Sequence, residues 1–198
     1  DRVCAYTALR AACAVEAPRK TAVCMLVDKE EIGSAGNTGM KSRYFENFIH
    51  DICEKTGADS RRCISNSACL SADVGAANDP NYSSVQEKRN AAVLNGGILL
   101  MKYTGSRGKS GSSDASAEFM NKIIRLFDRN EVVWQTGELG KVDAGGGGTV
   151  AQYVAQLDID VVDCGVPLLS MHAPFEIAAK ADVYMAYLAY KAFLQDCQ

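Results

Sequence analysis

Short apolar runs alternate along this chain with longer segments whose apolar residues recur at the spacing of a helix face. The runs predicted to form strands are a stretch ending at residues 71–74 and residues 21–27, 98–103, 132–136 and 160–164. The segments predicted to form helices are residues 3–15, 42–55, 115–128 and 174–194. Strands that alternate with helices pack as a helix-covered sheet, so we expect an α/β fold with a mixed sheet flanked by helices.

The length and the loops favour one domain. The 198 residues can bury a substantial core, and no internal repeat or Pro-rich linker divides them. Residues 104–113 are rich in Gly and Ser and are predicted to form a loop. Asp114 is expected to cap the helix that follows. Residues 143–148 are predicted to form a glycine turn that leads into a further helix. Because residues 2–15 resemble a helix already under way, we expect further protein upstream of residue 1.

Charge and composition narrow the classes of function. The formal net charge of -3 and the absence of a Lys/Arg tract argue against a nucleic-acid partner. No apolar span is long enough for a membrane helix, and we expect no signal peptide. The eight cysteines include no C-x-x-C pair and mostly lie in apolar runs, which favours reduced thiols packed as small core residues in a cytoplasmic protein.

Two adjacent carboxylates, Glu30 and Glu31, follow the predicted strand at residues 21–27. Successive side chains on an extended backbone point in opposite directions, so we expect the two glutamates to have different roles. A pair of this kind can divide the duties of proton acceptor and metal ligand, which suggests hydrolysis assisted by a bound metal.

Two further candidates lie where other predicted strands end. Asp73 follows one strand, and His172 lies in a turn between a strand and a helix. Ligands of open α/β sheets collect outside the carboxyl ends of strands, so Asp73, His172 and the glutamate pair are predicted to converge. Each also has an ordinary structural explanation, such as a surface Glu-Glu pair, a turn-capping aspartate or a structural histidine. The other histidine, His50, is expected to be a solvated helix residue.

Four motifs in order then match a known family: residues 26–34, residues 71–74 with 79–82, residues 146–149, and residues 170–174. Together they closely resemble the aspartyl aminopeptidase / aminopeptidase I family of zinc metallopeptidases, over essentially the whole chain. The resemblance implies a zinc-peptidase (phosphorylase/hydrolase-like) architecture and removal of N-terminal residues from peptides, with acidic residues preferred in one branch. By the same resemblance Glu30 is the general base, Glu31, Asp73 and His172 are metal ligands, and a complete site holds two zinc ions or other divalent metals.

In this family a further histidine and a bridging aspartate come from upstream segments, and residues 1–5 resemble the tail of the aspartate motif. Residues 1–198 are therefore interpreted as the C-terminal part of the catalytic domain, without the upstream segment and the inserted assembly domain. Relatives form large homo-oligomers, with dodecamers expected. Ala76 departs from the family, because many relatives carry His there.

Substrate contacts are predicted in two places. Lys102, with Arg107 and Lys109, could supply a cation for an acidic side chain, although a solvated mobile loop is the simpler explanation. Gly147 belongs to the turn at residues 145–148, which lacks a P-loop lysine and is interpreted as close backbone packing beside the substrate. Two other functions stay open: an inactive or scaffold subunit of the same assembly, and a carboxypeptidase or amidohydrolase on the same scaffold.

Overall fold

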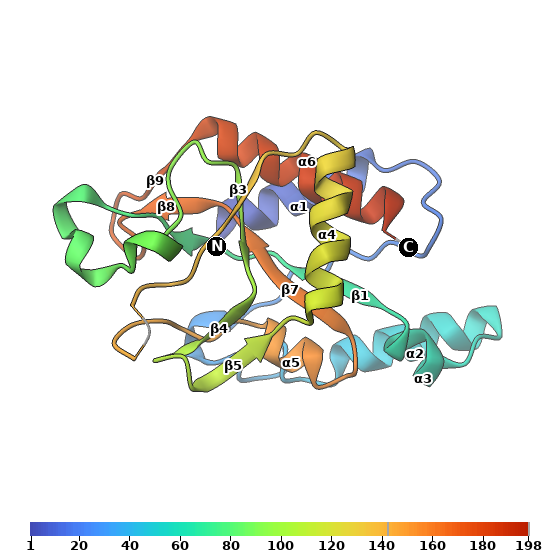
Figure 1. Cartoon of the computed structure of the whole chain (residues 1–198). Coiled ribbons are helices and arrows are strands. Elements are labelled where there is room, and N and C mark those ends of the chain that lie inside the picture. The colour runs from blue at the N-terminus through green and yellow to red at the C-terminus, as the bar shows by residue number, and fades with distance from the viewer. Residues whose placement is uncertain (142, 198) are drawn as a thin grey trace.

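The computed structural model describes residues 1–141 and 143–197 and has the predicted α/β fold, with a mixed sheet flanked by helices (Figure 1). The helices are α1 (Arg2–Ala14), α2 (Tyr44–Thr56), α3 (Ser60–Ser65), α4 (Ala117–Arg129), α5 (Ala151–Ala155) and α6 (Lys180–Asp196), with 3-10 turns η1 (Glu30–Ile32), η2 (Pro80–Val85) and η3 (Lys88–Asn90). The strands are β1 (Ala68–Ser71), β2 (Gly75–Ala76), β3 (Ile98–Met101), β4 (Tyr103–Ser106), β5 (Ser110–Asp114), β6 (Trp134–Thr136), β7 (Asp160–Gly165), β8 (Pro167–Leu169) and β9 (Ile177–Ala178).

The largest sheet has the strand order β1-β7-β3-β6 and contains both strand directions. Strand β7 is parallel to β1 and antiparallel to β3, and β3 is parallel to β6. The register places Asp163 of β7 between Ser71 of β1 and Met101 of β3. Two smaller sheets, β2-β8-β9 and the β4-β5 hairpin, adjoin it.

Side chains of β7 point alternately to the two faces of this sheet, and each face is covered. Val162 and Cys164 lie in the core formed with α1, α4 and α6, whereas Val161 packs with α5. The core-facing stripe of α4 follows helical spacing and consists of Phe119, Met120, Ile123, Leu126 and Phe127. The helices α1, α4 and α6 therefore form one layer against the sheet.

The predicted helices are present, but their starts are shifted by one to six residues, and the structure explains two of the shifts. Ser116, and not Asp114, caps α4, because its hydroxyl accepts a hydrogen bond from the Phe119 amide at 3.1 Å while Asp114 ends β5. The terminal helix begins at Lys180 and not at residue 174, because residues 177–178 pair with β8 as a strand. Sequence periodicity identified these helices, and tertiary pairing set their ends.

The prediction of a loop at residues 104–113 is wrong, because this segment forms the β4-β5 hairpin. A glycine strip, residues 145–148, runs along the other side of β4. The Gly105 amide donates to the Gly147 carbonyl at 2.8 Å, and the Arg107 amide donates to the Gly145 carbonyl at 2.7 Å. Backbone pairing on both sides thus orders a segment whose polar side chains gave no strand signal.

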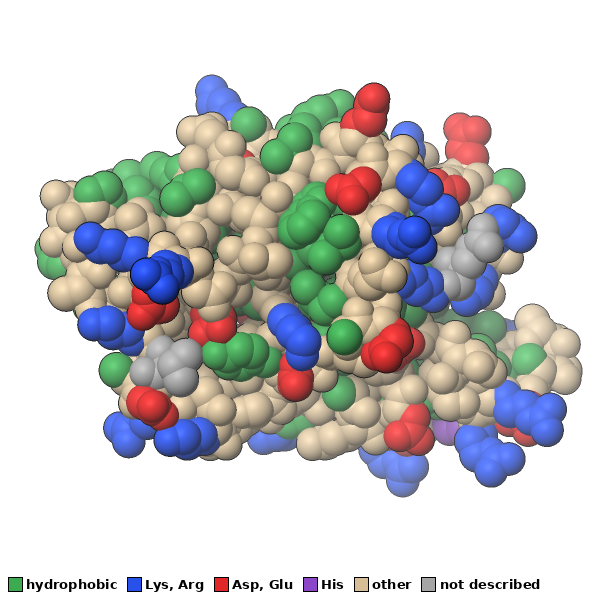
Figure 2. Space-filling model, viewed as in Figure 1, with side chains coloured by type: hydrophobic (Ala, Val, Ile, Leu, Met, Phe, Trp, Pro, Cys, Tyr) green, Lys and Arg blue, Asp and Glu red, His purple; other side chains and the backbone are tan. Residues whose placement is uncertain are grey.

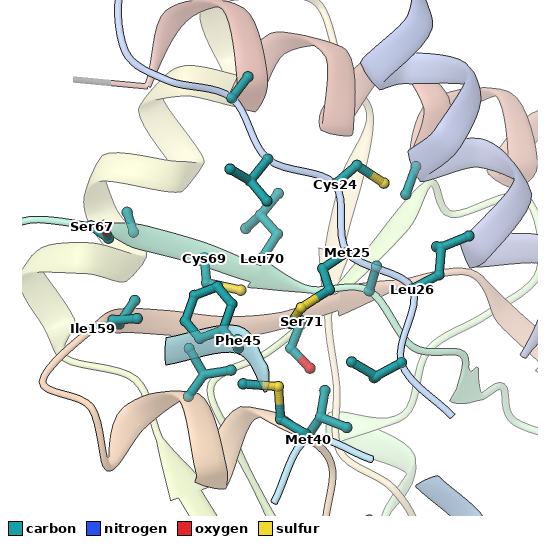
Figure 3. A pocket seen from close by; sticks show the side chains of 18 of the residues that line it. Cys24, Met25, Leu26, Met40, Phe45, Ser67, Cys69, Leu70, Ser71 and Ile159 are labelled. Atoms are coloured by element: carbon teal, nitrogen blue, oxygen red, sulfur yellow. The ribbon is translucent and has the colours of Figure 1, made fainter. Parts of the chain in front are cut away.

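The prediction of a buried strand at residues 21–27 is also wrong. None of these residues makes a backbone hydrogen bond to any part of the chain that the structure describes, and Leu26 is 57% exposed. The segment faces β1 across a cavity of about 1390 Å³. Cys24, Met25 and Leu26 lie on one side of this cavity, and Cys69, Leu70 and Ser71 of β1 on the other (Figure 3). A strand needs a bonded neighbour, and here the nearest edge is too far away to be one.

Cysteine burial follows the prediction only in part. All eight thiols are free, but only Cys4, Cys53 and Cys164 are buried, and Cys13 and Cys63 are exposed. On the face shown in Figure 2, basic and acidic side chains are interspersed. Within the described ranges, no helix combines the length and the apolar character needed to cross a membrane.

Candidate active site

Glu30 and Glu31 lie in η1, at the rim of the cavity between residues 21–27 and β1. Lys29 adopts a left-handed conformation with φ of 67° directly before η1, and Gly33 adopts one directly after it. The glutamates therefore occupy a tight turn, and the expectation that they alternate along an extended backbone is wrong. Glu30 is half-buried and Glu31 is exposed, so their surroundings still differ. Burial and the charge of Glu31 raise the pKa of Glu30.

Asp73 follows β1 and lines the same cavity. One of its carboxylate oxygens accepts a hydrogen bond from the Val74 amide at 2.8 Å. Burial, reinforced by the nearby charge of Glu30, raises the pKa of Asp73 to about 6. Asp73 and Glu30 are thus electrostatic neighbours, although they come from different segments.

His172 lies in the turn between β8 and β9, which replaces the predicted strand-to-helix turn. Its own φ is 66°, and its backbone amide donates to the Glu176 carboxylate at 2.6 Å. The turn directs the imidazole toward η1, where His172 Nε2 lies 3.9 Å from Glu31 Oε2. The two side chains remain accessible, with 67% and 71% of their surface exposed.

The Glu31–His172 pair fits a shared metal ion. Zinc binds nitrogen at ~2.0–2.1 Å and carboxylate oxygen at ~2.0–2.2 Å, so two ligands of one ion lie at most about 4.3 Å apart. The separation of 3.9 Å falls within that limit. No group of three or more His, Cys, Asp or Glu side chains close enough to hold a metal occurs in the ranges that the structure describes. The pair could therefore supply only part of the ligand set of an ion.

The predicted substrate contacts lie around the β4-β5 hairpin, and none of them lines the cavity. Lys102 forms an ion pair with Asp114, and Lys109 forms one with Asp143 at 2.7 Å. The Gly147 carbonyl accepts the hydrogen bond from the Gly105 amide described above. The close packing expected for the glycine strip is present, since a Cβ on Gly146 would lie only 2.3 Å from the Gly105 carbonyl oxygen.

His50 is exposed on α2, as expected for a solvated helix residue, and its Nδ1 lies 2.7 Å from the Ser60 hydroxyl. It belongs to the α2–α3 pair and does not line the cavity.

Sequence reasoning missed two residues that contact the segment bearing Asp73. Asp163 is 2% exposed and accepts a hydrogen bond from the Ser71 hydroxyl at 2.6 Å. Gly165 passes so close to Asp73 that a Cβ there would lie 1.6 Å from the Asp73 carbonyl oxygen. The only signal for Asp163 was an acid inside the apolar run at residues 160–164, and a single glycine at a strand end gave none.

Comparisons with known proteins give matches over nearly the whole chain. A family model described as aminopeptidase I zinc metalloprotease (M18) matches residues 1–194. A probable M18 family aminopeptidase 1 of Clostridium acetobutylicum is 51% identical over 200 residues, which cover 99% of this chain and 43% of that protein.

Solved structures show the same fold. A crystal structure of an M18 family aminopeptidase from Thermotoga maritima matches with a TM-score of 0.94 at 44% identity, covering 98% of this chain and 44% of that one. The structure of the mApe1 dodecamer of S. cerevisiae matches with a TM-score of 0.79 at 25% identity, covering 99% and 44%. This chain thus spans less than half the length of these relatives.

Proposed function

The chain belongs to the aminopeptidase I (M18) family of zinc metalloproteases, and we propose that it is part of a longer protein that acts as a metal-dependent aminopeptidase. The observation that carries the proposal is the meeting of Glu31 and His172, which come from opposite ends of the chain and lie 3.9 Å apart. A carboxylate and an imidazole at this separation are a natural donor pair for zinc.

The roles of the candidate residues follow from their surroundings. Glu31 and His172 would hold one ion, and Asp73 would contribute to a second, with the remaining ligands supplied by other parts of the longer protein. When bound, such ions lower the pKa of a water molecule and polarise the scissile carbonyl. Glu30, half-buried beside Asp73, would accept the proton of the attacking water and return it to the leaving amine.

The substrate would be a peptide with a free N-terminus, with acidic residues as one candidate class. The ion pair with Asp114 reduces the charge that Lys102 could offer to such a side chain. Arg107 forms no ion pair with a residue that the structure describes. Unlike that of Lys102 or Lys109, its charge is therefore not offset by a neighbouring carboxylate in the described part of the chain. Gly147, on the strip beside this hairpin, would lie along the bound peptide.

We propose that residues 1–198 are the C-terminal part of the catalytic domain and that another part of the longer protein inserts a strand into the cavity. Two facts support this. Residues 21–27 and the outer edge of β1 face each other and make no backbone hydrogen bond with another described strand, and apolar side chains such as Met25 and Leu70 line the cavity between them (Figure 3). An unpaired edge lined by apolar side chains favours strand addition.

Assembly and location are extensions of the same proposal. A homo-oligomer, with a dodecamer as the first candidate, is supported by the likeness to the mApe1 dodecamer of S. cerevisiae. A cytoplasmic location is supported by the eight free thiols.

The assignment of roles can be tested in the longer protein loaded with zinc. Glu30→Gln should keep zinc and lose turnover, whereas Asp73→Ala and His172→Ala should lose zinc, because only the latter two remove a ligand. The measurements are metal content after dialysis and the rate of hydrolysis of aminoacyl chromogenic substrates, including an acidic series. Equal zinc loss in all three variants would refute the division of roles.

Substrate direction needs a separate assay. Acetylation of the peptide N-terminus should abolish hydrolysis by an aminopeptidase, because the free amine is part of what it binds. If acetylated peptides are cleaved from their C-terminus instead, the carboxypeptidase alternative is correct. A wild-type protein that binds zinc and cleaves neither peptide is the scaffold subunit.

Hydrogen exchange tests the inserted strand. In the longer protein, the amides of residues 21–27 should exchange as slowly as those of β3, because a strand on that edge would bond them. The exposed turn η2 provides the fast reference. Rapid exchange at residues 21–27 would show that no strand lies there.

A further inference from the structure

A buried carboxylate behind the candidate site has no role in the chemistry proposed above. Asp163 lies in β7, is 2% exposed, and has no Lys, Arg or His within ion-pair distance among the residues that the structure describes. Its partners are hydroxyls. The Ser71 hydroxyl donates to Oδ1 at 2.6 Å and the Thr104 hydroxyl to Oδ2 at 3.4 Å, and the Thr149 hydroxyl is close enough to lower the pKa of the carboxyl.

Each of the three hydroxyls belongs to a different segment of the site. Ser71 ends β1 and is two residues before Asp73. Thr149 directly follows the glycine strip, residues 145–148, and Thr104 lies in β4, against which that strip is hydrogen-bonded. One carboxylate therefore joins the segment that carries a candidate metal ligand to the two segments, β4 and the glycine strip, beside which substrate contacts are predicted.

A carboxylate suits this position because it only accepts hydrogen bonds, and it has room for about four. Each hydroxyl that donates to it has a fixed hydrogen and a fixed rotamer, whereas a hydroxyl facing water does not. A buried charge without a cation is costly, so a purely structural position would be better filled by an apolar or amide side chain. The free-energy cost of burying the Asp163 charge is explained if the fixed positions of these hydroxyls help the site to bind its ligands.

We infer that Asp163 is a positioning residue that fixes the end of β1 bearing Asp73 and the glycine strip beside β4 in one mutual arrangement. The inference rests on the proposed function, since it concerns how well the site holds zinc and peptide. It assigns Asp163 no contact with metal or substrate.

The test compares Asp163 with a matched buried aspartate. Asp182 is 0% exposed and accepts the backbone amides of Asn95 and Gly97, both at 2.8 Å. These amides precede the start of β3, whereas Asp163 lies beside its last residue, Met101. Asp163 and Asp182 are thus equally buried at opposite ends of one strand.

In the longer, zinc-loaded protein, Asp163→Ala should weaken zinc binding by roughly 10–100-fold and raise KM for peptides, as loss of an outer supporting group does at metal sites. Asp163→Asn keeps the shape and one acceptor oxygen, so it should recover part of the loss. Asp182→Asn should lower the thermal midpoint while zinc affinity and KM per folded molecule stay at wild-type values. Ser71→Ala, which removes one donor, should reproduce part of the zinc defect and serves if Asp163→Ala does not fold.

Unchanged zinc affinity and KM in Asp163→Asn and Ser71→Ala, whatever their thermal stability, would overturn the inference and leave Asp163 a structural residue. Failure of the proposed function is recognised separately, because it is read from the wild-type protein. A wild type that neither binds zinc nor cleaves peptides would refute that function before any variant is compared.

Discussion

Replacing Gly165 by alanine should disable the site through Asp73, without touching a candidate ligand. The added Cβ would lie 1.6 Å from the Asp73 carbonyl oxygen and 2.5 Å from its carbonyl carbon, where ordinary contact begins at 3.4 Å. The Asp73 backbone must therefore retreat by about 1.8 Å. Both clashing atoms are backbone, so no side-chain rotation can relieve the overlap.

The displacement is large for a metal site and moderate for the fold. Metal–ligand distances are held to about 0.2 Å, so a shift several times larger should remove Asp73 from any ion that it binds. Overpacking of this kind costs roughly 1–3 kcal/mol, part of which is offset by ~0.4–1 kcal/mol because alanine restricts the unfolded chain. We expect a folded protein whose zinc affinity has fallen at least about tenfold.

The assay is zinc competition against a chelator in the longer protein, with urea unfolding of the same samples. Val166→Ala is the matched control, because it removes volume from a fully buried neighbour and adds nothing near Asp73. It should lose comparable stability and keep its zinc affinity. If Gly165→Ala binds zinc like the wild type, either the backbone yields elsewhere or Asp73 is not a ligand, and the predicted link between Gly165 and the metal site is wrong.

Two other predictions follow from the same packing. Burial raises the pKa of Asp163 to about 6 from 3.8, so the folded state holds its proton more tightly than the unfolded state does. The stability that this gives is fully present below about pH 4 and is lost as the pH rises through about 6. Between pH 4 and pH 7 the free energy of unfolding of Asp163→Asn should therefore rise by about 2 kcal/mol relative to that of the wild type. Urea unfolding across that range tests this, and a pH-independent difference contradicts it. Gly146→Ala should push the glycine strip off β4, because its Cβ would lie 2.3 Å from the Gly105 carbonyl oxygen and its φ is +92°; KM for peptides should rise while zinc affinity stays unchanged, and loss of zinc would show that the strip supports the metal site instead.

The pH prediction also separates stability from function at Asp163. If Asp163→Asn is at least as stable as the wild type at pH 7, then a weaker zinc affinity in this variant cannot result from unfolding. The two measurements on one variant thus distinguish a positioning residue from a structural one.

Local pattern in the sequence determined the elements that depend on local physics. The α4 helix was predicted within two residues, because apolar residues at helical spacing bury one face wherever the helix packs. Strand β7 was predicted within one residue, because the adjacent β-branched residues Val161 and Val162 favour an extended segment packed inside a sheet. The order of short motifs also identified the family without any structural information.

Local sequence pattern could not predict the segments whose secondary structure depends on backbone pairing with another part of the chain. Residues 21–27 have the composition of a strand, yet they form none, because no described edge reaches them. Residues 103–114 lack that composition and form a hairpin, because β4 is paired on both sides.

For the site, the sequence by itself determined which chemical groups are available: Glu30, Glu31, Asp73 and His172. Only the tertiary structure decided that Glu31 and His172 meet at 3.9 Å, and that Asp163 supports the segments around Asp73 from within the sheet. The physical reason is that distance along a chain does not fix distance in space. Strand register and left-handed turns bring these side chains together, and both are properties of the packed fold.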